Sequence, residues 1–438
     1  MNFETVTLGD LVKHKKGFAF KTKDYCETGI PVIKVSNFTN NSIEDIDLQY
    51  VPQAIANQNK SVELKENDIV IATVGSWASN PNSVVGKTIR VPSWANGSLM
   101  NQNAVILRSK NDSLVDQLFI FYYMKQQSFK DLIVSRSQGS ANQASITLES
   151  IFSCPVILPN NKTREAIVQV LSNLDKKIEV LHKNNKTLQS INQALFKSWF
   201  VDFDPVYKNQ KKLHANGITQ STMTLFSDNM KETEIGKVPA DWEVQELKEL
   251  ATRYVGKVKN PEDWHNLPLI DLSRIKSKTL FNVNHGLGQE LTTSVTKFNK
   301  GDILFGAIRP YFHKVTLADL DGVTNVSVFV VRPKDNRYYE YLLNLMFCES
   351  TVDYAVRLSK GTKMPVISWD DLSSLPLAVP PNAILSEFQK ISGPLIQKGI
   401  ENSNLINTLI ETRDTLLPRL ITGKIDLSEI EDQLEGVA

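Results

Sequence analysis

The chain has 438 residues, which is too long for one ordinary hydrophobic core and fits two or three domains. With 41% hydrophobic residues, 22% charged residues and a net charge of +1, the composition is that of a globular protein and does not single out nucleic acid as a partner. The three scattered cysteines exclude a disulfide framework, and neither a signal peptide nor a membrane span is predicted, so we expect a cytoplasmic protein.

Residues 1–160 predict one α+β domain. The apolar runs PVIKVSN, DIVIATV and NAVILRS are rich in β-branched residues and bounded by Gly, Asn and Pro, which is typical of short strands. The segment that starts at Asp112 has helical periodicity instead. We expect a partly closed β-sheet with helices packed against it.

The stretch from Thr163 to Trp199 predicts a helix far longer than the globular mean of about 11–12 residues. Its seam residues alternate in steps of four and three, the a/d spacing of a helix that packs along another helix. Two asparagines in the seam are polar residues of the kind that fix register and partner number. The alternative is a long core helix inside a larger domain. The predicted seam consists of Ile167, Leu171, Leu174, Ile178, Leu181, Asn185, Leu188, Asn192, Leu195 and Trp199.

Residues 205–235 predict a linker between this helix and the next domain. Pro205 stops the helix, because proline lacks the amide proton that continues the hydrogen-bond ladder. A small basic run follows, made of Lys208, Lys211, Lys212 and His214. The simplest interpretation of this run is a solvated segment.

The sequence then repeats itself. TLGDLVKHKKGFAF near the N-terminus is matched by QELKELATRYVGKV, ENDIVIATVG by KGDILFGAIRP, and NQNAVILRSK by TNVSVFVVRPK. The later stretch GSANQASITLESIFSCPVILP is matched by GTKMPVISWDDLSSLPLAVP. Because the spacing between matched residues such as Asp68 and Asp302 stays steady, we predict a duplicated domain at 236–382 with insertions and deletions in its loops. A two-fold repeat is too short for a solenoid.

A second seam follows the second copy and starts at Ile384. Gly393 and Pro394 lie inside it, so we expect a kink or a late start of this helix. Two such helices can bury their apolar stripes against each other. The predicted seam residues of this helix are Phe388, Ile391, Leu395, Asn402, Leu405, Leu409 and Leu416.

The predicted fold class is α+β, with two similar domains, each a partly closed β-sheet plus helices. Two long antiparallel coiled-coil helices join them into a pseudo-twofold object. The predicted segments are a first domain, a central helix, a linker, a second domain, a distal helix and a C-terminal tail, at 1–160, 161–204, 205–235, 236–382, 383–424 and 425–438.

Motifs for catalysis are mostly missing. GKT at Gly86 ends like a phosphate-binding loop, but Pro81 stands where the first glycine is needed. The segment Asp204–Tyr207 lacks the second proline of an adenine-methyltransferase motif, and the carboxylates and lysine between Asp241 and Lys248 resemble a nuclease site only at a spacing that occurs by chance. We therefore expect no catalytic residue, no metal ligand and no cofactor site in this chain.

Several stretches resemble the specificity subunits of type I restriction–modification enzymes. ALFKSWFVDFDPV at Ala194 is similar to the central region of that family, and LLPRLITGKIDL at Leu416 to its distal region. ETEIGKVPADWEVQELKEL at Glu232 is similar to the opening of the second recognition domain. The loop at Gly139, followed by PVILPN and a long helix, resembles the end of a target recognition domain. The resemblance covers nearly the whole chain.

This resemblance implies a non-catalytic subunit that recognises DNA sequence in a restriction system. Each target recognition domain would read one half of a bipartite, asymmetric target in double-stranded DNA. The helices would set the spacer and dock two adenine-methyltransferase subunits, which restriction/translocase subunits join. S-adenosylmethionine, ATP and Mg would then be bound by those partners. The alternatives are a stand-alone metal-dependent nuclease and a coiled-coil scaffold for proteins.

Loops that carry phosphate donors together with base-edge readers are the candidate DNA contacts. Such loops recur at matched places in both copies, although the alternative for any one residue is an ordinary polar loop position. In the first copy the candidates are Lys16, Lys21, Trp77, Asn80, Arg136, Gln138, Asn142 and Gln143. In the second copy they are Lys257, Arg309, Tyr311, His313, Lys314, Lys360, Thr362 and Lys363.

Overall fold

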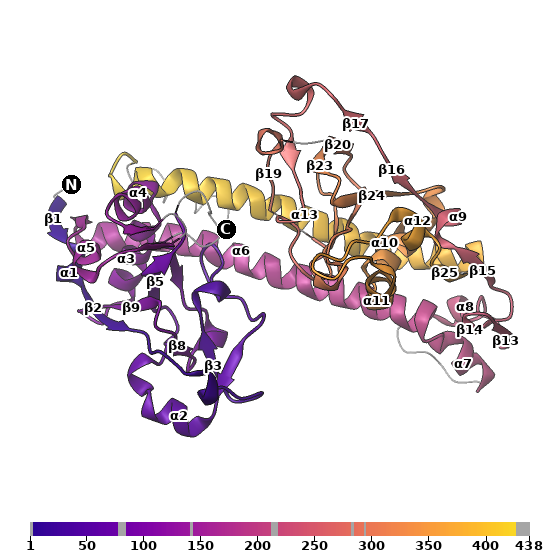
Figure 1. Ribbon diagram of the computed structural model, residues 1–438, viewed down its shortest axis with the longest axis horizontal. Helices are drawn as coiled ribbons and strands as arrows, with labels where there is room; N and C mark the ends of the chain where they lie inside the picture. The colour runs from indigo at the N-terminus through magenta and orange to yellow at the C-terminus, as the bar shows by residue number, and fades with distance from the viewer. Residues whose placement is uncertain are drawn as a thin grey trace. The chain divides into compact units, whose positions relative to one another are not determined.

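The computed structural model describes residues 3–77, 85–140, 143–211, 218–281, 284–292 and 295–425. The chain forms two compact units. Unit 1 combines Met1–Lys176 with Ile410–Ala438, and unit 2 comprises Lys177–Leu409. Two long helices, α6 (Asn161–Phe196) and α13 (Asn382–Ile421), are drawn in magenta and yellow in Figure 1. Each unit contains part of both helices, whereas the predicted division gave each helix a segment of its own.

The centre of unit 1 is a four-stranded antiparallel sheet. Its strands are, in spatial order, β2 (Val12–Lys16), β9 (Ala104–Ser109), β5 (Ile69–Ala72) and β7 (Thr88–Arg90). Ile69 and Ile71 of β5 point into one hydrophobic cluster, while Val70 and Ala72 point into another. Because both faces of β5 are buried, its sequence is a continuous apolar run without polar alternation.

Helices and short strands close these two clusters. The first cluster contains residues of α3 and α4 together with residues of both long helices, such as Ile167 and Leu417. The second cluster lies between the sheet and the β3, β4 and β8 strands. β1 pairs with β12 in a separate antiparallel ribbon. The bounds of these elements, with the short helices, are β1 Phe3–Thr7, α1 Leu8–Leu11, β3 Ile30–Ile33, β4 Gln49–Val51, α2 Gln53–Gln58, β8 Leu99–Met100, α3 Leu114–Lys125, α4 Gln127–Ser135, α5 Leu148–Phe152 and β12 Pro155–Pro159.

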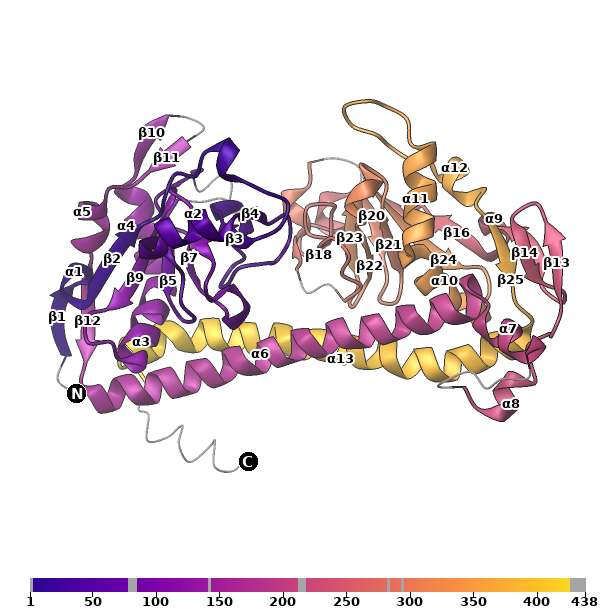
Figure 2. The same cartoon turned by 90° about the horizontal axis from the view of Figure 1, so that it is seen from below.

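Unit 2 repeats this arrangement, which confirms the duplication predicted from the sequence. Its central sheet is also antiparallel, with the spatial order β16 (Ala251–Tyr254), β24 (Val328–Pro333), β21 (Ile303–Gly306) and β22 (Val315–Leu317). Helices α10 and α11 pack beside it as α3 and α4 do in unit 1 (Figure 2). The remaining elements are β14 Gly236–Pro239, β15 Glu243–Glu246, α9 Leu247–Leu250, β17 Lys257–Val258, β18 Pro268–Leu269, β19 Gly286–Leu287, β20 Val295–Phe298, β23 Gly322–Asn325, α10 Tyr339–Phe347, α11 Glu349–Leu358, α12 Trp369–Ser373 and β25 Pro376–Val379.

An ion pair recurs at the same place in both sheets. In unit 1, Arg108 Nε donates to Asp68 Oδ1 at 2.7 Å and Nη2 donates to Oδ2 at 2.6 Å. In unit 2, Arg332 Nε donates to Asp302 Oδ1 at 2.6 Å and Nη2 donates to Oδ2 at 2.7 Å. Each aspartate precedes the central strand and each arginine lies on the neighbouring strand. The duplication therefore extends to a two-pronged hydrogen bond that ties the two central strands together.

The predicted seam of α6 faces inward. Arg413 of α13 donates from Nη1 to Asp175 Oδ1 at 2.9 Å beside the part of this seam in unit 1. In unit 2, Asn402 Nδ2 donates to Asn185 Oδ1 at 2.9 Å, and Ser392 Oγ donates to Asn192 Oδ1 at 2.7 Å. Of the ten seam residues, those fully buried are Ile167, Leu171, Ile178, Leu181, Asn185, Asn192 and Trp199, and those half-buried are Leu174, Leu188 and Leu195.

The predicted seam of α13 is partly out of phase. Ile391 and Leu405 were assigned wrongly, because they are 38% and 41% exposed. Their neighbours Ser392 and Ile406 are buried instead. Phe388 and Asn402 are buried as expected, and Leu395, Leu409 and Leu416 are half-buried. The late start was also wrong, since the helix begins at Asn382 and runs through Pro394.

The described part of residues 205–235 is folded and not a solvated linker. The long helix ends in a π-helical turn, Lys197–Val201, and Phe203 then takes a left-handed conformation before α7 (Asp204–Gln210) begins. Two further elements, α8 (Gln220–Met223) and β13 (Met230–Thr233), follow. Val206 and Phe226 are buried in the core of unit 2. Lys212 and His214 of the predicted basic run lie outside the described residues.

Candidate nucleic-acid interface

The predicted DNA-binding loops of unit 1 leave the same end of its sheet. Ala72 at the end of β5 pairs with Ala104, and Lys16 at the end of β2 pairs with the next residue, Val105. Thr88, which starts β7, pairs with Ile71. The connections after β2, after β5 and before β7 therefore converge, although they are far apart in sequence.

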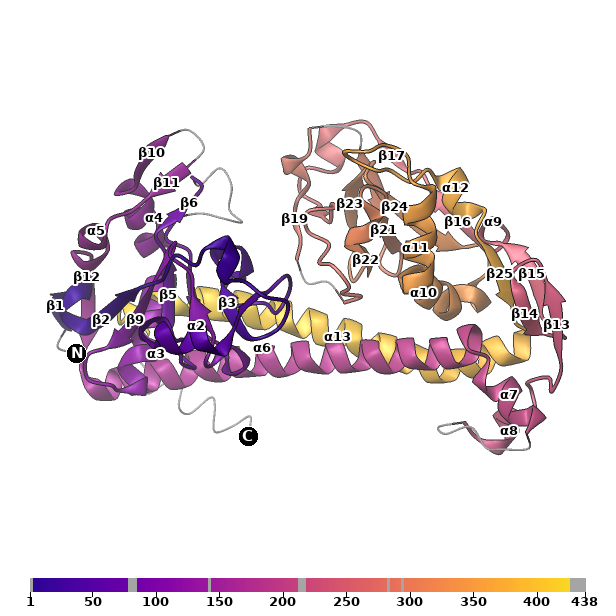
Figure 3. The same ribbon diagram turned by 60° about the horizontal axis from the view of Figure 1, so that its bottom comes forward.

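A small ribbon stands at this end of the sheet. β6 (Val74–Gly75) follows β5 and pairs with β11 (Gln143–Ser145), which pairs in turn with β10 (Gln138–Ser140). Figure 3 shows this three-stranded ribbon beside the upper end of β5. The side chains of Gln138 and Gln143 are exposed on it, while Trp77 is half-buried and packs against the first cluster. Asn80 and Asn142 lie outside the described residues.

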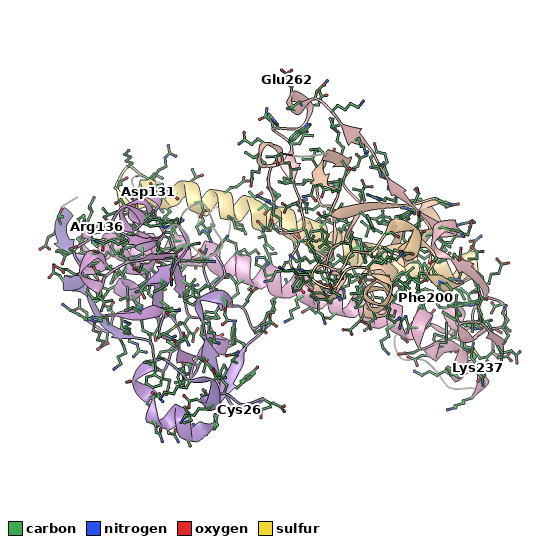
Figure 4. The ribbon with its side chains drawn as sticks, viewed as in Figure 1. Cys26, Asp131, Arg136, Phe200, Lys237 and Glu262 are labelled. Atoms are coloured by element: carbon green, nitrogen blue, oxygen red, sulfur yellow. The ribbon has the colours of Figure 1, made fainter. Side chains whose placement is uncertain are left out.

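The basic candidates of unit 1 differ in their availability. Lys16 and Lys21 are exposed and can reach a phosphate. Arg136 is not presented in this way, because its Nη1 donates to the Ser150 carbonyl at 2.8 Å and to Ser153 Oγ at 3.1 Å. Arg136, labelled in Figure 4, thus links the end of α4 to α5 and has a structural role. Its assignment as a base reader does not fit these contacts.

The matched loops of unit 2 also converge at one sheet end. Gly306 at the end of β21 pairs with Val328, and Phe305 pairs with Val315 at the start of β22. The segment between β21 and β22 joins the loop after α11 through the bridge of Ile308 with Val366. The exposed Lys257 follows the end of β16 on the same side of the sheet, since Tyr254 pairs with Val330. The strand pattern that gathers the unit 1 loops is therefore repeated.

The segment between β21 and β22 holds two aromatic rings outward. Its centre is the 3-10 turn η9 (Pro310–Phe312), and the residues on either side, Arg309 and His313, have φ angles of 49° and 48°. Such left-handed conformations cost about 1–3 kcal/mol each in non-glycine residues. Tyr311 is 51% exposed and Phe312 44% exposed, with their ring centroids 4.7 Å apart. Sequence reasoning named Tyr311 and missed Phe312, although two adjacent aromatics after a proline were a visible signal.

Two of the predicted contact residues in this segment point inward. The ring of His313 is buried, and its Nε2 donates to the Phe347 carbonyl at 2.9 Å. Burial lowers the pKa of His313 below its usual value, so the neutral ring is favoured. Lys314 Nζ donates to the Leu272 carbonyl at 2.6 Å, and burial lowers its pKa as well. Their assignment as DNA contacts is corrected, because both side chains support the turn from inside.

The loop after α11 supplies exposed polar and basic groups beside the turn. Lys360 and Val366 exchange two backbone hydrogen bonds of 2.9 Å, which close the loop. Thr362 and Lys363 are exposed at its tip, and Lys360 forms an exposed ion pair of 3.1 Å with Asp371. Arg309 Nη2 donates to the Lys363 carbonyl at 3.4 Å, so this guanidinium already has a partner within the unit.

No group of three or more His, Cys, Asp and Glu side chains among the described residues could hold a metal ion. Over the same residues, no helix combines the length and the apolar character required to cross a membrane. The exposed loops at the two sheet ends remain the candidate site.

Comparison with known proteins gives consistent matches. The family model for the type I restriction modification DNA specificity domain matches residues 1–190 and 239–412. The MjaIX specificity subunit of a type I restriction enzyme from Methanocaldococcus jannaschii is 24% identical over 339 residues, covering 73% of this chain and 71% of that protein. The HindI specificity subunit from Haemophilus influenzae is 26% identical over 370 residues, covering 73% and 80%.

A solved structure shares the fold. The S subunit of a type I restriction-modification system from M. genitalium aligns with a TM-score of 0.51, over 96% of each chain. Its sequence identity is 15%, so the likeness concerns the fold alone. The predicted architecture, two sheet-rich units with long helices, is confirmed by this match.

Proposed function

Because the chain belongs to the family of type I restriction–modification DNA specificity subunits, we propose that units 1 and 2 each read one half of a bipartite, asymmetric target in double-stranded DNA. The exposed loops at the sheet end of each unit would make the contacts. In this proposal the chain carries no catalytic residue and binds no cofactor of its own, and it acts in the cytoplasm.

One observation carries the proposal. The two sheets have the same strand order and the same buried ion pair, yet the side chains exposed at their ends differ. Unit 1 exposes Gln138 and Gln143, whose amides match the hydrogen-bonding edge of adenine. Unit 2 exposes Tyr311, Phe312 and Lys363. Two sheets of the same architecture that carry different exposed loop side chains would recognise two different half-sites.

The long helices would dock the partner subunits. Val180 and Ile191 are exposed on α6, eleven residues apart, which places them on one face of the helix. Ile391 and Leu405 are exposed on α13 and also share a face. Exposed apolar side chains that share a helix face are groups that a partner subunit could cover. We assign this surface to two methyltransferase subunits, joined by restriction/translocase subunits, with S-adenosylmethionine, ATP and Mg bound on those partners.

A genome-wide map of N6-methyladenine tests the reading function. Cells would express the cognate methyltransferase with this chain or without it. We expect methylation at a split motif, two defined blocks around a fixed gap, that disappears without the chain. Methylation that is unchanged without the chain would contradict the proposed function.

The division of labour between units is tested with Gln143→Ala. Loss of a two-pronged contact to a base is worth about 1–3 kcal/mol of discrimination, so the block read by unit 1 should become degenerate while the other block stays defined. Gln58→Ala is the matched control, because Gln58 is also exposed in unit 1 but lies on α2. Equal loss of definition in both blocks would refute the separate reading of half-sites.

Docking is tested by the double variant Val180→Asp and Ile191→Asp. Both side chains are exposed, so the variant should fold and yet fail to copurify with the methyltransferase. Copurification at the wild-type level would place the docking surface elsewhere.

A further inference from the structure

The turn that carries Tyr311 and Phe312 is held rigidly from both sides. The Arg309 amide donates to the Pro365 carbonyl at 2.7 Å, and Ser277 Oγ donates to the Phe312 carbonyl at 2.6 Å. The Lys278 amide donates to the His313 carbonyl at 2.9 Å. With the buried His313 ring also bonded to Phe347, the unusual backbone is fixed by several independent contacts.

The rings themselves receive little of this support. They contact each other in a tilted arrangement, at an interplanar angle of 54°, and remain about half exposed. Strained backbone conformations and exposed apolar side chains are both typical of functional sites, and this turn combines them. Met364 and Val366 of the adjoining loop are exposed next to the turn and extend this apolar surface.

The turn also offers few polar groups for reading base edges. His313 and Lys314 are engaged inside the unit, and the described contacts of Arg309 run to the backbone of the adjoining loop. Tyr311 has one hydroxyl and Phe312 has no polar atom. Lys363, in contrast, is exposed at the tip of the adjoining loop and can neutralise a phosphate, and the exposed Lys360 could do so by exchanging its ion pair with Asp371 for one. The arrangement is a rigid apolar tip flanked by cations.

We propose that the Tyr311–Phe312 pair is a wedge that enters the base stack of the half-site read by unit 2 and partly unstacks one base step. Apolar side chains inserted between base steps bend the duplex, and the cost of unstacking depends on the step, so the wedge also selects sequence. This inference rests on the proposed function, because it needs unit 2 to lie on DNA.

The wedge belongs to unit 2. The matching segment of unit 1, between β5 and β7, contains one aromatic residue, Trp77, and that ring packs against the hydrophobic cluster. Unstacking is therefore expected in one half-site of the target and not at the matched place in the other. This asymmetry gives the experiment an internal reference.

Fluorescent base analogues report the unstacking directly. The complex of the full chain with its methyltransferase is titrated with duplexes that carry the mapped target. Each adenine is replaced in turn by 2-aminopurine and each guanine by 3-methylisoxanthopterin, so that every base pair of both half-sites is covered. The half-site of unit 2 is the one that stays defined in the Gln143→Ala variant. We expect brighter emission on binding at one step of that half-site.

The variants separate the rings from other sources of emission. In Tyr311→Ser with Phe312→Ser the increase should vanish, and affinity for the target should fall by about 5- to 150-fold, the loss of one ring–base stack. Tyr311→Phe keeps both rings and should retain the increase in emission. It provides a second test in case the double variant is unstable. Trp94→Ser removes a ring that is 43% exposed in unit 1 and serves as the matched control, with no change expected.

Three results would overturn the wedge. The first is tight binding without increased emission at any position of the unit 2 half-site. The second is an increase at that step that persists in the double serine variant, since another group would then unstack the base; the adenine that the methyltransferase flips out of the duplex is left out of this comparison. The third is an affinity loss that replacing thymine by uracil reproduces, because the rings would then contact a thymine methyl group in the groove. In each case the methylation map could still show a split motif, so failure of the wedge is distinguishable from failure of the proposed function.

Discussion

The matched ion pairs allow each unit to be destabilised while the other serves as its reference. In Asp302→Ala, the guanidinium of Arg332 loses a carboxylate whose side chain is 7% exposed, and the Asn299 amide loses its acceptor at 2.7 Å. Removing one partner of a buried pair costs about 3–5 kcal/mol. Arg332 is 27% exposed and stacks on Tyr254 at 3.7 Å, so water and the ring compensate in part. We therefore expect Asp302→Ala to lower the free energy of unfolding of unit 2 by about 2–4 kcal/mol.

Amide hydrogen exchange measures this loss unit by unit. In Asp302→Ala, amides of β21 and β24 should exchange about 30- to 800-fold faster, which is the same free energy expressed as an opening equilibrium. Amides of β5 and β9 in unit 1 should be unchanged. Asp68→Ala should give the mirror result, because Arg108 and Asp68 have the same geometry and nearly the same burial. Equal acceleration in both units, from either variant, would refute the reasoning that each unit opens around its own pair.

Three further predictions follow from buried groups. Leu181→Asp should lower the free energy of unfolding by more than the roughly 1.5–3 kcal/mol of a buried leucine, because the new charge has no partner. Val180→Asp on the exposed face of the same helix should change it by under about 0.5 kcal/mol. Urea titration measures both variants, and similar unfolding midpoints would contradict the burial of the seam. Asn192→Leu should lower the free energy of unfolding by about 1–3 kcal/mol, because Asn344 and Ser392 each lose one of their hydrogen bonds. A neutral result in thermal melts would show that the buried network contributes no stability. Burial lowers the pKa of His313 in the folded protein, so its contribution to stability is present above the pKa of the unfolded chain and is lost as the pH falls below it. The difference in unfolding free energy between wild type and His313→Gln should therefore shrink from pH 7.5 to pH 5. A difference that stays constant over this range would exclude the titration of His313.

Sequence reasoning was strongest where a pattern is local and repeated. The seam of α6 is a property of residue spacing within one helix, and all of its ten residues are at least half-buried. The match of Asp68 with Asp302 came from aligned apolar runs, and in the structure each aspartate pairs with an arginine at the matched place, Arg108 or Arg332. Such features need no knowledge of which loops meet in space.

The weaker predictions depended on tertiary contacts. In α13, several apolar residues flank the seam, so residue spacing alone did not decide between Ile391 and Ser392 as the buried residue. The structure buries Ser392, whose hydroxyl donates a hydrogen bond to Asn192. His313 and Lys314 read as contact residues because they are polar, but the left-handed turn aims them inward. Charge and polarity predict that a residue can bind DNA, whereas the backbone decides where its side chain points.

The convergence of loops explains how one framework can read different sequences. In both units the antiparallel order of four strands brings the same connections to one sheet end, whatever residues those connections contain. The buried pair of aspartate and arginine lies before the central strand, at the opposite end of the sheet from Ala72 or Gly306. A change in the loops therefore leaves the contacts that hold the sheet together unchanged. The pairing of the central strands and the specificity are then separate properties of each unit, and exposed loop residues can change without rebuilding the sheet.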